Sequence, residues 1–260
     1  MLALGFFASG AISATAQVKP AIPLPIDPST VVITMDWQGT YRVGRMLSAP
    51  PIPPGPVLSI RADGTATAIA RADEPPREIR GVLPPDEIQQ LLHFAVDEKE
   101  FFAINGADIQ KAIADEQKRM GRGFTVSDSS NTIIHIETAD KANDVKFYAL
   151  DVYAKHYPAI KALQQLRTVE IKLEHIYLEL MAGGKAEVAR SLDRANAYMK
   201  QQDSAFSPLS ADDLFTVQTV NGNKTTQFYR DQKNGKSLSV TVVETPNVPP
   251  IIKSQLRTNF

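Results

Sequence analysis

Apolar residues recur at every third or fourth position from Pro158 to Met199, with one interruption at Gly183-Gly184. Before the glycine pair this spacing runs for about 24 residues, enough for a long amphipathic helix. Its apolar positions are Ile160, Leu163, Leu166, Val169, Leu173, Ile176 and Leu180. After the pair a second stripe follows, made of Val188, Leu192, Ala195 and Met199. Two helices joined by a short glycine turn form an antiparallel helical hairpin, which must bury both stripes against other elements.

Segments with strand character lie on both sides of this helical hairpin. On the N-terminal side, "VLSIRADGTATAIA" (57–70) alternates around Asp63-Gly64, and "NTIIHIET" and "DVKFYAL" are joined by a polar turn. On the C-terminal side, "LFTVQTV", "TTQFYRD" and "SLSVTVVE" are separated by asparagine- and glycine-containing turns. Alternation between turn residues is typical of antiparallel hairpins. The sequence therefore predicts an α+β fold, with antiparallel β-hairpins packed with amphipathic helices, the long helical hairpin and a C-terminal three-stranded β-meander.

Two shorter helices are expected before the long one. Pro85, Asp86 and Glu87 suit the first turn of a helix, whose end leads into the adjacent aromatic residues Phe101 and Phe102. We expect this aromatic pair to fill the gap between the helix and a sheet, with Asn105-Gly106 as the following turn. Residues 107–120 have the spacing of another amphipathic helix.

The N-terminus has the features of a secretory signal peptide. An uncharged run from Leu2 ends in Ala14-Thr15-Ala16, a small-x-small cleavage pattern, although no basic residue precedes the run. The chain contains no cysteine, so neither disulfides nor a lipidated cysteine are expected. We expect cleavage before Gln17 and export to the periplasm or exterior of a bacterium, with no membrane span in the mature chain.

Proline content and turn signals divide the chain further. After the signal peptide, a proline-rich segment encloses "VVITMDWQGTYRVG" (31–44), expected as a hairpin that turns at Gln38-Gly39. Whether the two β regions share one core is open. The expected divisions are a signal peptide (1–16), a proline-rich segment with a hairpin (17–56), an α+β domain (57–181), a helix with the meander (185–245) and a C-terminal tail (246–260).

Charge and motif content exclude several classes of function. The formal net charge is −1, whereas nucleic-acid-binding proteins carry a clustered basic excess. No nucleophile elbow, zinc-binding His-Glu-x-x-His motif or glycine-rich dinucleotide loop is present. No metal site and no cofactor are therefore predicted.

Weak candidates for a site remain. His135 and Glu137 lie two apart on an expected strand and so share one face, and His156 follows in a later loop; together they form a possible metal or acid–base site. Trp37 is the only tryptophan, and with Tyr41 it is the candidate anchor for a partner, since such rings bury a large area at little entropic cost. The competing interpretations are that the three polar side chains face water and that Trp37 packs under the proline-rich segment 47–56.

Residues 57–172 resemble an uncharacterised domain found in exported and envelope proteins of bacteria. The segments that carry the resemblance are "LSIRADGT", "DEIQQLLHFA", "EFFAI", "SSNTIIHIETADKANDVKFYAL" and "PAIKALQQLRTVEIKL". The resemblance implies a small α+β domain of unknown function and brings no catalytic residues. The helix at 107–120 departs from the shorter connection expected there, so this insert is where a specific function could reside.

These observations favour a non-enzymatic binding or scaffold module of the cell envelope, whose partner would be an unknown protein or envelope component. The alternative is a hydrolase with an unfamiliar site that uses His135, Glu137 and His156.

Overall fold

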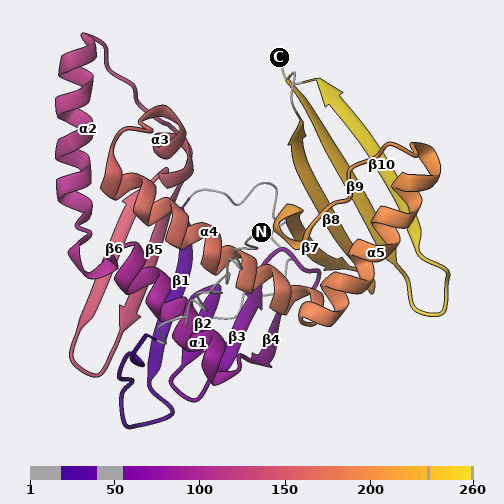
Figure 1. The fold of residues 1–260 in the computed structure, drawn as a ribbon, viewed down its shortest axis with the longest axis horizontal. Coiled ribbons are helices and arrows are strands. Elements are labelled where there is room, and N and C mark those ends of the chain that lie inside the picture. The colour runs from indigo at the N-terminus through magenta and orange to yellow at the C-terminus, as the bar shows by residue number, and fades with distance from the viewer. Residues whose placement is uncertain (1–18, 40–54, 233–234, 259–260) are drawn as a thin grey trace, which may run out of the picture.

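The computed structural model describes residues 19–39, 55–232 and 235–258, which form two antiparallel sheets joined by helices (Figure 1). The fold is α+β, with the long helical pair and the C-terminal meander that the sequence predicts. In the described part of the chain no helix is both long and apolar enough to cross a membrane.

The first sheet is six-stranded, with the order β4-β3-β2-β1-β5-β6. Its members are β1 (Val31–Gly39), β2 (Leu58–Arg61), β3 (Thr65–Ala70), β4 (Arg77–Val82), β5 (Ser130–Glu137) and β6 (Ala142–Tyr148). The β2–β3 and β5–β6 hairpins confirm the expected pairs, with Gly64 at positive φ in the first turn. Strand β4 was not anticipated, because its "REIRGV" sequence places charged residues on both faces of the strand and so shows no apolar–polar alternation.

The second sheet is four-stranded, with the order β10-β9-β8-β7. Its members are β7 (Leu214–Val220), β8 (Asn223–Gln232), β9 (Lys236–Glu244) and β10 (Ile251–Thr258). The first three are the predicted meander. The segment expected as a C-terminal tail instead adds β10, which pairs with β9 along its whole length.

The helices connect and cover these sheets. They are α1 (Pro85–Leu92), a π-helical turn (His93–Glu98), a 3₁₀ turn (Phe101–Ala103), α2 (Gly106–Met120), α3 (Leu150–His156), α4 (Lys161–Ala182), α5 (Lys185–Gln202) and a 3₁₀ turn (Ala211–Asp213). Helix α4 ends at Gly183, whose φ of 99° glycine adopts readily, as the glycine pair predicts. Helix α3 was missed because its seven residues are too few for a clear apolar period.

The N-terminal strand departs from the expected hairpin. Gln38 and Gly39 do not turn but continue β1, which pairs with β5 on one side and β2 on the other. At this end of β1, Gln38 and Gly39 pair with Asn131 and Ser130 of β5, and this long-range pairing outweighs the local turn signal. Residues 40–54, and with them the expected return strand, lie outside the described residues.

The aromatic pair after α1 has the expected architectural role. The Phe101 side chain is fully buried, and Phe102 is partly buried against it in an edge contact. Positive φ falls on Glu100 rather than at Asn105-Gly106. Asn105 instead caps α2, because its side-chain oxygen accepts a hydrogen bond from the backbone N–H of Ala107.

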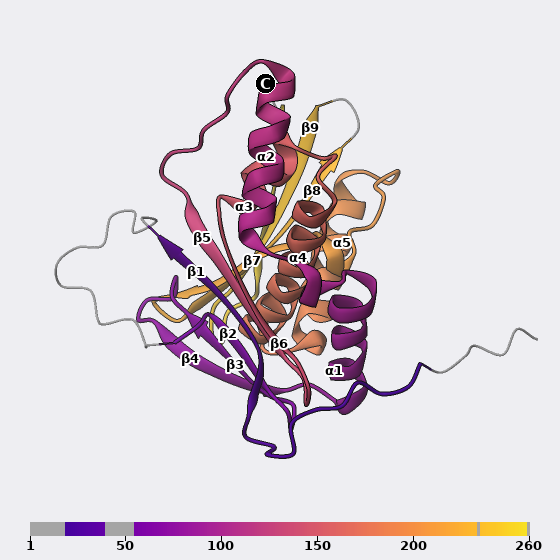
Figure 2. The same ribbon diagram turned by 90° about the vertical axis from the view of Figure 1, so that its left-hand side faces the viewer.

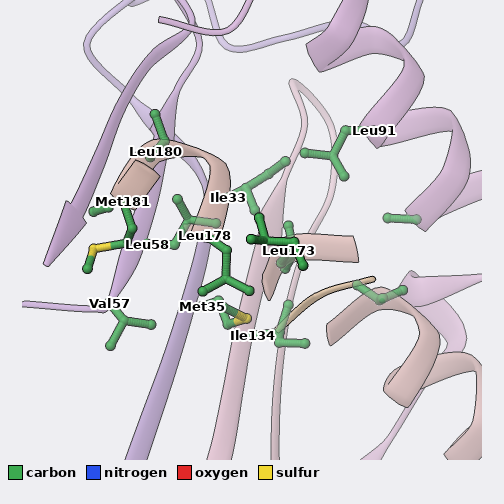
Figure 3. Packing of buried hydrophobic residues seen from close by; sticks show 14 of the residues in the cluster. Ile33, Met35, Val57, Leu58, Leu91, Ile134, Leu173, Leu178, Leu180 and Met181 are labelled. Carbon is green, nitrogen blue, oxygen red and sulfur yellow. The ribbon is translucent and has the colours of Figure 1, made fainter. Parts of the chain in front are cut away.

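One contiguous cluster of buried apolar side chains spans both sheets. Helices α1 and α4 cover the same face of the first sheet, and the C-terminal part of α4 also contacts β7 of the second sheet (Figures 1 and 2). Leu173 and Leu178 of α4 belong to the same cluster as Ile33 and Met35 of β1 (Figure 3). The two β regions therefore share one core through α4.

A buried carboxylate also ties the two sheets together. Asp73 lies in the β3–β4 connection and is 1% exposed. Its side chain accepts hydrogen bonds from the backbone N–H of Thr219 in β7, at 2.7 Å, and from Arg77 Nε, at 2.6 Å. The backbone N–H of Glu74 donates to the Thr219 carbonyl at 2.9 Å. These bonds set the position of β7 against the first sheet.

If α4 joins both sheets into one core, truncating its buried face should destabilise the whole molecule. We expect Leu173→Ala to lower the free energy of unfolding by about 2–5 kcal/mol, because it deletes buried methyl groups and leaves a cavity. Denaturant unfolding should remain a single transition by circular dichroism and by Trp37 fluorescence. Ile171→Ala, on the same helix but 40% exposed, is the control and should cost less than about 1 kcal/mol. Two separate transitions would contradict the shared core.

Candidate functional site

His135 and Glu137 lie together on the outer face of the first sheet. Thr132, Ile134 and Ile136 of β5 are buried on the helix-covered face, so the alternate residues point the other way. His135 Nδ1 is 2.9 Å from Asp144 Oδ1 of β6, and its Nε2 is 3.4 Å from Glu137 Oε2. The imidazole therefore lies between two carboxylates on an open sheet surface.

His156 does not join this pair. It lies at the end of α3, where its ring stacks on Phe124 with centroids 3.9 Å apart. Helix α3 packs against the helix-covered side of the sheet, since Tyr153 contacts Phe147, whose strand neighbour is the buried Thr132. Among the described residues no group of three or more His, Asp or Glu side chains is arranged to hold a metal ion.

Trp37 is used inside the molecule. Its indole Nε1 donates a hydrogen bond to Glu170 Oε1 of α4 at 2.9 Å, and its ring meets Tyr177 edge-on at 5.8 Å. The side chain is partly buried and packs against the core. Tyr41, the other candidate anchor, and most of the proline-rich segment lie outside the described residues.

Glu170 is the centre of a buried polar network that sequence reasoning missed. It is only 3% exposed, and besides Trp37 it accepts hydrogen bonds from Thr132 Oγ1 at 2.6 Å and Arg167 Nη1 at 2.6 Å. A buried carboxylate is costly unless it is paired in this way. A signal for it exists in the sequence, because Glu170 occupies the apolar stripe of α4 between Leu166 and Leu173.

Burial also shifts the proton affinity of groups beside this network. Burial, with a contribution from the charge of Asp73, raises the pKa of Tyr177 to about 12. The pKa of Glu174 is likewise raised, mainly by desolvation, although Arg167 opposes the shift. Both groups lie on α4, and each shift disfavours the charged form.

The candidate binding site is a pocket beside β6, the edge strand of the first sheet. It lies between α2, the connection that follows it, the end of β6 and the start of α3, and it has a volume of about 270 Å³. Its lining residues are Gln110, Ile113, Ala114, Gln117, Phe124, Thr125, Phe147, Tyr148 and Tyr153.

Aromatic contacts hold one wall of this pocket in place. Phe124 meets Tyr153 edge-on at 5.8 Å and Tyr157 at 6.3 Å, and Tyr153 stacks on Tyr157 at 6.1 Å. Gln117 of α2 donates hydrogen bonds to the Phe124 carbonyl and to the Tyr157 hydroxyl, at 2.8 and 3.0 Å. The glutamine thus fixes the loop that carries Phe124 against both helices.

The chemistry of the lining favours binding over proton transfer. It consists of apolar, aromatic, amide and hydroxyl groups, and it contains no carboxylate, imidazole or amine. Sequence reasoning pointed to the α2 insert but not to Phe124 or Tyr153, because they come together only when α2 and α3 pack.

Comparison with family models, with curated proteins and with solved structures finds no significant match to this chain.

The buried tyrosine predicts a stability change in alkaline solution. Between pH 10 and pH 12 the unfolded chain releases the Tyr177 proton while the folded chain retains it, so stability should fall as pH rises through this window. We expect this residue to account for a loss of about 2 kcal/mol, and we expect Tyr177→Phe to remove that part of the pH dependence. The measurement is the free energy of unfolding of both proteins at pH 9 and across the window. Since the remaining tyrosines are common to both, parallel curves would contradict the assignment.

Proposed function

We propose that the protein is a non-enzymatic, exported binding or scaffold module, and that the pocket beside α2 receives an apolar or aromatic side chain of a partner protein or envelope component. The composition of the pocket carries this proposal. Its lining combines the rings of Phe124, Phe147 and Tyr153 with the amide of Gln110 and the hydroxyl of Thr125. Rings of this kind contribute a large contact area with little loss of rotamer freedom.

The size of the pocket supports a side chain rather than a whole substrate molecule. Pockets for drug-sized ligands occupy roughly 300–1,000 Å³. A volume of about 270 Å³ lies below that range and suits a single ring or branched side chain. The partner would then rest on the surrounding surface of α2 and α3.

The position of the pocket agrees with the resemblance of residues 57–172 to an exported α+β domain of unknown function. The helix within that segment that departs from the expected pattern is α2, and α2 contributes Gln110, Ile113, Ala114 and Gln117 to the lining. Binding sites are often carried by segments inserted into a stable sheet, because the sheet holds the inserted segment in position and tolerates changes in its sequence.

Export of the protein is the second part of the proposal. It is supported by the uncharged N-terminal run that ends in Ala14-Thr15-Ala16 and by the absence of cysteine.

The alternative, a hydrolase that uses His135, Glu137 and His156, has weaker support. His135 has carboxylates on both sides, which would suit a general base. However, His156 contacts Phe124 on the other side of the sheet, so the three side chains do not converge.

Filling the pocket should abolish binding. We expect N-acetyl-tryptophanamide, a probe for a side chain, to shift the amide resonances of the pocket residues in a saturable manner. Ala114→Trp should remove these shifts, because the exposed position of Ala114 at the pocket lets the new indole occupy the space without disturbing the core.

Asp115→Trp is the matched control for this experiment. Asp115 is an exposed neighbour on α2 that does not line the pocket, so its variant should bind the probe as the unmodified protein does. Shifts that are spread over the surface, or that persist in Ala114→Trp, would contradict the assignment of the pocket.

Export makes a separate prediction about the N-terminus. Mature protein isolated from its native host should begin at or near Gln17, as determined by N-terminal sequencing, because signal peptidase cleaves after small-x-small sequences. Mature material that retains Met1 would exclude cleavage.

A further inference from the structure

Strand β10 forms one edge of the second sheet and has β9 as its single neighbour among the described strands (Figure 1). Every side chain from Ile251 to Arg257 is exposed except Ile252, which is partly buried. An edge strand presents a row of unpaired backbone N–H and C=O groups to any extended segment of suitable sequence.

Several apolar side chains are exposed at this edge of the sheet. Ile251 is 52% exposed and Leu256 is 56% exposed, and Val248 in the preceding turn is 52% exposed. Natural edge strands are normally kept from pairing by charges, proline or bulges. Here Lys253 and Arg257 are the strand's only charges, and the eight-residue strand pairs with β9 without a bulge.

The pairing of β10 with β9 assigns its two faces. Ile252, Ser254 and Leu256 lie opposite Val242, Val240 and Leu238, which are buried. Lys253, Gln255 and Arg257 point to the other side of the sheet. One face of the edge is therefore apolar apart from a central serine, and the other carries both cations.

We propose that β10 pairs with β10 of a second copy of this chain, antiparallel and centred on Ser254, so that two four-stranded sheets join into one continuous sheet. A two-fold axis perpendicular to the sheet relates the copies, which keeps α5 on the same side in both. This interface lies apart from the pocket beside α2 and does not depend on it.

The charges select this register over its neighbours. Centred on Ser254, the pairing places Lys253 opposite Gln255 of the second copy and Arg257 opposite Ile251, so no cation is directly opposite another. Centred on Lys253, the two lysines would face each other. Centred on Gln255, Lys253 would face Arg257. Like charges directly opposite each other destabilise a strand pair, so of these three registers the one centred on Ser254 is favoured.

The same register also matches the apolar residues. It places Ile252 opposite Leu256 of the second copy, twice by symmetry, on the face next to α5. Exposed Leu256 thereby gains an apolar neighbour, which cross-strand pairing favours. A net charge of −1 adds little repulsion between the copies.

The experiment is sedimentation velocity of the full chain over a range of concentrations, combined with hydrogen exchange. We expect a monomer–dimer equilibrium, with the amides of β10 becoming more protected as the concentration rises. A single monomeric species over the whole soluble range overturns the proposal.

Substitutions at Gln255 test the register. Gln255 is exposed, and its side-chain oxygen accepts a hydrogen bond from Arg257 of the same strand, so changes there should leave the monomer folded. Gln255→Lys places a lysine opposite Lys253 at both symmetric positions, and the dissociation constant should rise about tenfold. Gln255→Glu places a carboxylate there instead and should lower the dissociation constant.

A charge exchange completes the test. In the double variant Lys253→Glu with Gln255→Lys, a glutamate faces a lysine at both positions, so association should return to at least the level of the unmodified chain. A dimer that is indifferent to all three variants would lie on another surface and overturn the proposal.

Discussion

The structure depends on the burial of α4 against two sheets at once. Its Leu166, Val169 and Leu173 are at most 1% exposed and belong to the same core cluster as β1 and β5. The C-terminal part of the same helix contacts β7, so neither sheet completes its core without it. With no cysteine in the chain, no disulfide supports the fold, which depends on this burial instead. The glycine pair after α4 then directs α5 across the second sheet, where it covers β9 and β10.

Buried polar groups specify how these layers meet. Glu170 joins α4 to β1 and β5 through Trp37 and Thr132, and Asp73 joins the first sheet to β7 through the Thr219 backbone. Replacing such a group by an apolar one of the same shape can cost little, whereas removing its partners leaves a buried charge uncompensated. Their contribution is therefore to the arrangement more than to the net stability. A helix that slid along its axis would lose these bonds, while apolar contacts would partly re-form.

This architecture leaves the pocket and the open edge strand at the margins of the sheets. Helices α1, α4 and α5 cover one face of each sheet. Trp37, whose type is a good interface anchor, instead holds α4 through its hydrogen bond to Glu170. The pocket lies beyond β6, where α2 and α3 meet, and the open strand β10 lies at the margin of the other sheet. In the two proposals above, the pocket holds a partner's side chain and β10 pairs with a second copy of the chain. The two roles are physically independent, because no residue belongs to both surfaces.

The sequence by itself determined many of the local elements, although β4 and α3 were missed. The turns at Asp63-Gly64 and at the glycine pair after α4 follow from the backbone conformations that these residues favour. The alternation of β5 and the helical spacing of α4 predict which faces are buried. Both properties depend on residues that are close in the sequence. The neighbours of the expected site residues could be predicted only in part from the sequence. His135 and Glu137 do share a face, but Asp144 joins them and His156 does not, because strand register and helix docking decide those neighbours. Tertiary structure also decided that Gln38-Gly39 stays extended, that the presumed tail becomes β10, and that Phe124 and Tyr153 form a pocket wall. In each case the deciding hydrogen bonds or ring contacts join residues that are distant in the chain, so no local pattern of residues contains them.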